Sequence, residues 1–183
     1  MVLAVGRLDD NKRLDIFLEA LAAARKVEPQ LTGMIAGDGP ARDTLRTRAA
    51  SLGLLPEGVR FLGQVLNMAE TYASADIFVH LAISEGTPNV VLEAMAAGLP
   101  VVATGAGDTC RIIRPMLNGC LVPFDDAQSV SERLVELARS PDLRARLGKQ
   151  GRTDVARLFS LEEVRDSLER FYSAVVPHSA VRA

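Results

Sequence analysis

Two glutamates, Glu85 and Glu93, stand in the segment SEGTPNVVLEAMAAG, which runs from Ser84 to Gly98. Glu93 has apolar neighbours on both sides, and a carboxylate in such surroundings needs a partner that offsets its lost hydration. It therefore either faces water or binds a ligand. Glu85 lies just before the expected helix and Glu93 lies more than one turn inside it, so the two carboxylates can reach different parts of one extended ligand.

The start of the same helix is suited to an anion. Pro88 fits the first helical position, so the free amides near Gly86, Thr87, Asn89 and Val90 would point out of the helix N-terminus. Such amides attract phosphate or sugar oxygens. Glycine at position 86 lets a ligand approach the backbone closely.

A second loop, GRLDDNK from Gly6 to Lys12, supplies positive charge. Arg7 offers a guanidinium fork and Lys12 a point charge, which together suit a diphosphate. Most such residues are solvated charges on a loop. Arg7 and Lys12, however, follow the first strand-like run, and in α/β sheets ligands bind at the loops that follow the strands. An anion site flanked by carboxylates indicates an anion with hydroxyl groups attached, namely a nucleotide sugar.

The hydrophobic pattern predicts the fold that positions these two loops. Short apolar runs alternate with helical patterns along the chain. The strand-like runs are 2–5, 31–36, 59–62, 76–81, 100–104 and a last short one from Cys120. We therefore predict a Rossmann-like α/β fold, a doubly wound parallel sheet of about six strands. With the common strand order 3-2-1-4-5-6, the loops after strands one and four face the same crevice.

Further signals mark the helices between and after these strands. Pro40 suits the first turn of the helix after the GDGP loop, and Asp125 or Asp126 suits the cap of the helix that follows the last strand. Ser160 and Glu163 form a capping box. The apolar residues of this last helix recur at helical spacing: Leu161, Val164, Leu168 and Phe171.

Composition limits the class of protein. A chain of 183 residues, 48% hydrophobic and 24% charged, fits one domain, which we place at residues 1–176 with a frayed tail at 177–183. The formal charge of −2 gives no basic field for nucleic acid. Cys110 and Cys120 read as free thiols in a reducing cytosol. With no membrane-length apolar run, no signal-peptide pattern and no metal-ligand cluster, we expect a cytoplasmic protein without metal or cofactor.

The segments VGRLDDNK, GDGP, VRFLG and especially SEGTPNVVLEAMAAGLPVVAT resemble the C-terminal domain of retaining GT-B glycosyltransferases of the group-one (GT4-like) family. The resemblance spans nearly the whole chain, and the E-x7-E arrangement is its most specific part. It implies that Arg7 and Lys12 contact the donor's diphosphate, that Glu85 lies by the donor sugar and that Glu93 binds the ribose. The catalytic residues expected from it are Glu85, Arg7 and Lys12, and the substrate-binding residues are Gly6, Gly86, Thr87, Pro88, Asn89, Val90 and Glu93.

The resemblance also implies what lies outside this chain. A complete GT-B enzyme has two Rossmann-like domains, so this chain would be the half that binds the nucleotide-diphosphate sugar, and an N-terminal domain would hold an unidentified acceptor. Alone, this half should not catalyse transfer. The implied reaction is metal-independent, in agreement with the absence of a D-x-D pair from the sequence. Peripheral membrane association of the full enzyme is left open.

The chain departs from the family pattern in two loops. Arg13 follows Lys12, where family members commonly carry glycine, and the segment AGDTCR, residues 106–111, stands where they carry GG-x-PE. Arg111 replaces the usual acid of that segment. A divergent or degenerate site would leave a second function, a non-catalytic nucleotide-binding module.

A third function is a dinucleotide-dependent oxidoreductase. The segment GAGDTC loosely matches G-x-G-x-x-G, with Asp125 twenty residues beyond Gly105, but Cys110 replaces the third glycine and the segment does not follow the first strand. Two other polar residues are given structural roles. We expect His80 to be a core or strand-end residue, and Asp38 to help cap the helix after GDGP.

Overall fold

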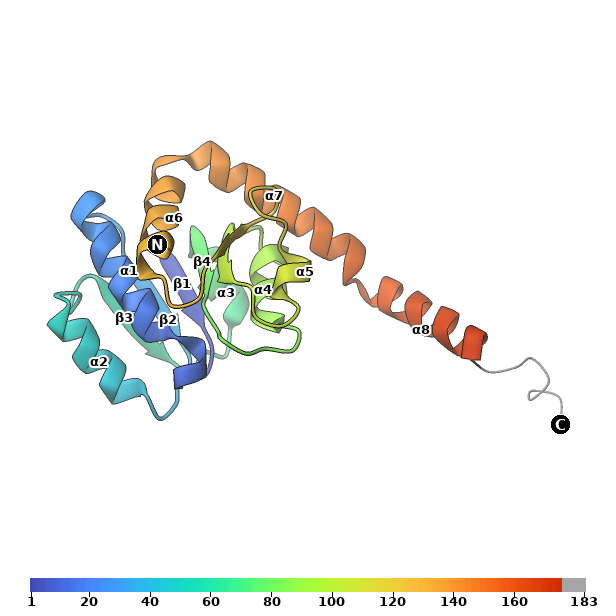
Figure 1. Cartoon of the computed structure of the whole chain (residues 1–183), viewed down its shortest axis with the longest axis horizontal. Coiled ribbons are helices and arrows are strands. Elements are labelled where there is room, and N and C mark those ends of the chain that lie inside the picture. The colour runs from blue at the N-terminus through green and yellow to red at the C-terminus, as the bar shows by residue number, and fades with distance from the viewer. Residues whose placement is uncertain (176–183) are drawn as a thin grey trace.

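The computed structural model describes residues 1–175 and contains a six-stranded parallel sheet (Figure 1). Its strands are β1 (Val2–Val5), β2 (Gly33–Ala36), β3 (Val59–Gly63), β4 (Ile77–His80), β5 (Val101–Thr104) and β6 (Cys120–Val122). They lie in the order β3-β2-β1-β4-β5-β6, and every neighbouring pair is parallel. The predicted doubly wound α/β sheet and its strand order are confirmed.

Helices cover both faces of this sheet. They are α1 (Leu14–Val27), α2 (Arg42–Ser51), α3 (Met68–Ala73), α4 (Asn89–Ala96), α5 (Thr109–Ile112), α6 (Ala127–Arg139), α7 (Pro141–Leu158) and α8 (Leu161–Val175), with a short 3-10 turn, η1 (Asp10–Lys12). Side chains alternate along each strand, so the core has two layers. Ala4 belongs to a cluster with buried residues of α1, α2, α6 and the first half of α7, whereas Leu3 belongs to a cluster with buried residues of α3, α4, α5 and the end of α7. Burial on both faces explains why β1, β2, β4 and β5 read as mostly apolar runs, whereas the edge strand β3 is only partly buried.

The structure corrects several predicted boundaries. Pro40 lies before α2, which begins at Arg42, and Pro88 is the N-cap of α4, not its first helical residue. Helix α7 was not predicted, although Ser140 and Pro141 form a start signal. The Ser140 side chain accepts a hydrogen bond from the amide of Leu143, and Pro141 occupies the first turn.

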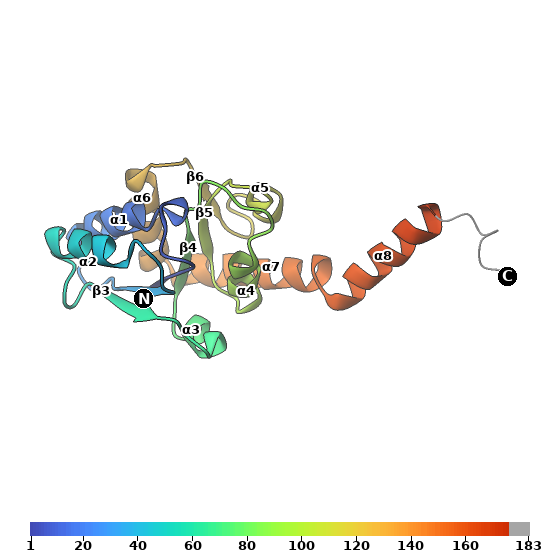
Figure 2. The same ribbon diagram turned by 90° about the horizontal axis from the view of Figure 1, so that it is seen from below.

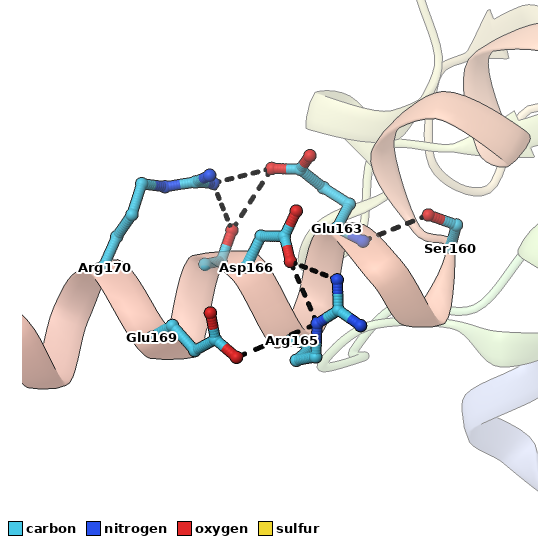
Figure 3. Close-up of polar contacts among 7 residues, drawn as sticks. Ser160, Glu163, Arg165, Asp166, Glu169 and Arg170 are labelled. Carbon is cyan, nitrogen blue, oxygen red and sulfur yellow. Dashed lines mark hydrogen bonds and ion pairs between the residues drawn. The ribbon is translucent and has the colours of Figure 1, made fainter.

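Helix α8 projects away from the sheet (Figures 1 and 2). None of its residues is buried, and Leu161 is 85% and Phe171 60% exposed. Half of the predicted capping box is present, because Ser160 Oγ accepts a hydrogen bond from the amide of Glu163 at 3.1 Å. The carboxylate of Glu163 instead accepts hydrogen bonds from Ser167 and Arg170 on the polar side of the helix (Figure 3). The apolar side of α8 therefore has no cover within residues 1–175.

The predicted tail at 177–183 lies outside the described residues. Within residues 1–175, no helix is long and apolar enough to cross a membrane. Both cysteines are free thiols, with Cys110 exposed and Cys120 buried.

Candidate functional site

An ion pair between Lys12 and Glu85 lies at the carboxyl ends of β1 and β4, which are neighbours in the sheet. Lys12 ends the turn η1 after β1, and Glu85 lies in the loop between β4 and α4. Both side chains are sheltered, at 18% and 16% exposure. The structure therefore brings together two of the residues that the sequence assigned to one crevice.

Asn11 joins the loops that carry this pair. Its side-chain amide donates to the carbonyl of Ser84 at 2.9 Å, and its amide oxygen accepts from the Ser84 N–H at 3.0 Å. The carbonyl of Asn11 also accepts a hydrogen bond from the amide of Ile83 at 3.0 Å. No local sequence pattern signals this role, because the partners are separated by 73 residues and meet only in the folded sheet.

The other residues of the first loop have separate positions. The Arg7 side chain is 72% exposed and its Nε lies 3.6 Å from Asp9 Oδ2, which leaves the guanidinium open to an anionic ligand. Gly6 lies against Lys12, and a Cβ there would stand 3.3 Å from Lys12 Cε. Gly6 thus leaves room for the lysine stem.

The start of α4 offers free backbone donors beside Glu85. Pro88 caps the helix without a side-chain hydrogen bond, so the amides of Asn89 and Val90 have no intrahelical acceptor. These amides and the positive end of the helix dipole suit an anion. The predicted residues Gly86 and Thr87 precede this N-terminus directly.

The unusual segment 106–111 forms hydrogen bonds with the loop between β4 and α4. Asp108 accepts a hydrogen bond from Thr87 Oγ1 at 2.7 Å, and its own amide donates to the carbonyl of Gly86 at 3.0 Å. The Thr87 hydroxyl and then Arg111 lower the pKa of Asp108. Gly107 has φ +54°, and a Cβ there would lie 2.1 Å from the carbonyl oxygen of Glu85, so the chains can approach only at a glycine. In this chain the segment supports the loop that carries Glu85.

His80 is the third member of the Lys12–Glu85 cluster. It is 3% exposed at the end of β4, as expected for a strand-end core residue, and its Nε2 lies 3.3 Å from Glu85 Oε1. This Nε2 forms no hydrogen bond within the described residues. Burial, and next the charge of Lys12, lower the pKa of His80 to about 4, although Glu85 opposes the shift. The imidazole is therefore neutral at pH 7. Its proximity to Glu85 was not predicted from the sequence.

Glu93 occupies a different place from Glu85. Its Oε2 accepts a hydrogen bond from Tyr72 Oη at 2.8 Å, and burial together with this bond raises the pKa of Tyr72. The carboxylate is exposed and lines a groove of about 550 Å³ between α3, α4 and α7. Within residues 1–175, no hydrogen bond or ion pair joins it to Lys12 or Glu85. Within the described residues, Glu93 thus faces solvent and has one protein partner, Tyr72.

Two further acidic residues, Asp38 and Asp125, form contacts with their neighbours in the fold. Asp38 accepts hydrogen bonds from the amide of Gly39 at 2.8 Å and from Arg42 at 3.1 Å, so it braces the GDGP loop. It does not cap α2, because the N-cap is Ala41. Asp125, the acid that the oxidoreductase reading required, pairs with Arg13. Helix α5 also spans only four residues after the fifth strand, which does not suit a dinucleotide fingerprint.

Comparison with known proteins decides the family. A family model described as "Glycosyl transferases group 1" matches residues 1–154. The chain belongs to the group 1 glycosyl transferases. One relative is the lipopolysaccharide core biosynthesis glycosyltransferase LpsE of Rhizobium meliloti, 30% identical over 91% of this chain and 48% of the relative. Another, the phosphatidyl-myo-inositol mannosyltransferase of Mycobacterium leprae, is 34% identical over 95% of this chain and 46% of the relative.

The chain spans about half the length of these curated relatives. Solved structures share its fold. The C-terminal domain of the group 1 glycosyl transferase LpcC from Francisella tularensis has a TM-score of 0.80 and 27% identity, over 87% of this chain and 86% of that one. Anabaena HepE, solved with UDP and glucose, has a TM-score of 0.86 and 24% identity, over 94% of this chain and 48% of HepE. The fold is thus the Rossmann-like fold of GT-B glycosyltransferases.

Proposed function

We propose that this chain is the donor-binding half of a retaining glycosyltransferase and that it binds a nucleotide-diphosphate sugar at the crevice between β1 and β4. The observation that carries the proposal is the Lys12–Glu85 pair beside the open N-terminus of α4. A cation, a carboxylate and free amides are the groups that recognise an anion bearing hydroxyls. Membership of the group 1 glycosyl transferases and the UDP and glucose bound by HepE support the same ligand class.

Each of these residues would bind a different part of the ligand. Arg7 and Lys12 stabilise the negative charge that grows on the diphosphate as the sugar leaves. Glu85 holds the donor sugar near its reacting carbon, and the amides of Asn89 and Val90 bind phosphate or sugar oxygens. Glu93 accepts hydrogen bonds from the ribose with the oxygen that Tyr72 leaves free. No metal ion is required, because the two cations neutralise the leaving group.

The acceptor would be held by a separate N-terminal domain. Two observations support this part of the proposal: the chain spans about half the length of its relatives, and the apolar side of α8 has no cover within residues 1–175. That domain would orient the acceptor and help to exclude water from the crevice. The isolated chain should therefore bind the donor and transfer little or no sugar.

The charge of Arg7 tests the diphosphate subsite. Arg7→Ala should weaken binding of a nucleoside diphosphate about ten- to a hundredfold and leave binding of the free nucleoside unchanged, because a hydrogen bond to a charged group contributes about 1.5–3 kcal/mol. Arg46→Ala on α2, whose guanidinium stacks over Phe61, is the matched control that removes an equal charge elsewhere. Isothermal titration measures each affinity. Equal diphosphate affinities for Arg7→Ala and the wild type would remove Arg7 from the site.

A non-catalytic nucleotide-binding module is the second candidate, since two loops depart from the family pattern. The two functions differ in one assay. This chain joined to its native N-terminal half should transfer radiolabelled sugar if the chain is part of an enzyme. Binding without transfer by the joined protein would favour the module.

A further inference from the structure

We propose that His80 is a positioning residue that takes over the carboxylate of Glu85 when Lys12 moves to the diphosphate. The inference rests on the proposed function, and it adds a partner exchange at the crevice. A phosphate group that binds Lys12 would compete with Glu85 for the N–H donors and the position of its ammonium, so donor binding would weaken the ion pair present in this structure. A sheltered carboxylate that loses its partner is costly unless another donor replaces the lost one.

The geometry places that second donor at the same atom. Lys12 Nζ and His80 Nε2 both face Glu85 Oε1, the imidazole at 3.3 Å. Nε2 is buried and unbonded within the described residues, so no other acceptor competes for it there. The two atoms are already within hydrogen-bond distance, so a small reorientation of the Glu85 carboxylate would align it with the imidazole N–H.

Charge selects the tautomer and explains why a histidine suits the position. A carboxylate only accepts hydrogen bonds, so the imidazole nitrogen that faces it must carry the proton. Burial and the neighbouring Lys12 keep the ring neutral at pH 7. A neutral donor can hold Glu85 without adding a third positive charge that would attract the diphosphate away from Lys12 and Arg7. Glu85 would then keep its place beside the donor sugar throughout the exchange.

The test reads the imidazole directly by long-range ¹H–¹⁵N NMR on the 183-residue chain. The sequence has two histidines, His80 and His178, and a His80→Gln variant assigns their signals. We expect the Nε2–H tautomer for His80 in the free protein. Saturation with UDP, GDP or ADP, whichever binds, should move the Hε2 resonance downfield as the bond to Glu85 forms, and Glu85→Gln should abolish the movement. An Nδ1–H tautomer, or an Hε2 resonance that does not move at saturation, would overturn the proposal.

The same NMR measurement without nucleotide tests this inference separately from the proposed function. Lys12→Met removes the competing ammonium, so His80 should bond Glu85 and its Hε2 resonance should move downfield without any nucleotide. Lys26→Met on α1 is the matched control and should leave the resonance in place. If no nucleotide binds the wild type but the Lys12→Met shift appears, the donor site fails, whereas the competition of Lys12 and His80 for Glu85 stands. If the shift is absent from Lys12→Met, the exchange is wrong.

Affinity gives a second readout. His80→Leu leaves Glu85 without a donor once Lys12 is drawn away, so nucleoside diphosphate affinity should fall about tenfold, which corresponds to one lost hydrogen bond to a charged group. His80→Gln carries an amide donor and should recover most of the loss. Unchanged affinity in a folded His80→Leu protein would contradict the proposal, and the NMR arm decides the matter if this variant does not fold.

Discussion

Arg13 occupies a position at which the family pattern described above has glycine. Its φ of +46° and ψ of +44° are left-handed, a conformation that glycine adopts without strain and other residues rarely adopt. The glycine that family members commonly carry here thus has a structural reason. Arg13 keeps the same conformation, and its guanidinium pairs with Asp15 at 3.1 Å and with Asp125.

Two substitutions separate the backbone strain from the ion pairs. Arg13→Gly and Arg13→Ala both remove the guanidinium, so their difference reports the backbone alone. We expect the glycine variant to be more stable than the alanine variant by about 1 kcal/mol, because alanine retains the left-handed strain. Urea unfolding measures both. Equal stabilities would show that position 13 does not need a left-handed conformation.

The buried histidine should make stability depend on pH. Burial lowers the pKa of His80 from its usual 6.5 to about 4, so between these values the unfolded chain binds a proton that the folded chain does not. The free energy of unfolding should therefore fall as the pH falls from 6.5 to 4, by up to about 1.4 kcal/mol per pH unit, and it should recover on returning to pH 7. His80→Gln should lack this contribution. Parallel stability profiles for the two proteins would contradict it.

Glu93 and its proposed ribose contact can be tested by matched ligands. Glu93→Gln keeps the shape and an oxygen for the Tyr72 hydroxyl, but it loses charge-assisted acceptance. A ribonucleoside diphosphate should bind the variant about tenfold more weakly, whereas its 2′,3′-dideoxy analogue should bind both proteins equally. Calorimetric titration of the four combinations decides the point. A variant that binds normally but melts earlier would make Glu93 structural.

Among the elements, the sequence predicts most of the sheet and little of its side-chain contacts. Periodic apolar runs and turn residues predicted the six strands, and the common order of doubly wound sheets then placed two loops together at one edge. The Lys12–Glu85 pair, the Asn11 bridge and the Tyr72–Glu93 bond depend on side-chain reach between segments far apart in sequence. Such contacts leave no local pattern. Helix α7, in contrast, had a readable start signal at Ser140 and Pro141.

Helix α8 should contribute little to the stability of the isolated chain. It buries no residue, whereas Asp154 near the end of α7 is 4% exposed and bonded to Arg114, Asn118 and Gln150. Removing residues 161–183 should leave the free energy of unfolding within about 0.5 kcal/mol of the intact chain. Asp154→Ala, the contrasting change, should cost about 3 kcal/mol.

Circular dichroism during urea unfolding measures both changes. A large loss of stability on removing residues 161–183 would mean that α8 packs against this domain in solution. The exposed apolar side of α8 would then have its cover within the chain and would no longer indicate an N-terminal domain.

At the scale of the whole molecule, the chain is weakly acidic, and the charged residues proposed for the site, Arg7, Lys12 and Glu85, lie at one edge of the sheet. The formal charge of −2 offers no broad attraction for anions, so binding must depend on a few placed groups. The fold and family follow from the sequence pattern, but the base, the sugar and the acceptor do not, because backbone groups can read a base and the acceptor would lie on another domain. We therefore propose above all that the chain binds a nucleoside diphosphate.

Calorimetric titration of the 183-residue chain with UDP, GDP, ADP and NAD tests that claim most directly. We expect at least one of the three nucleoside diphosphates to bind with one site per chain, and its affinity to fall when Lys12 is replaced by methionine, while NAD does not bind. Binding of NAD alone, or of none of the four ligands, would contradict a nucleotide-diphosphate site at the crevice between β1 and β4.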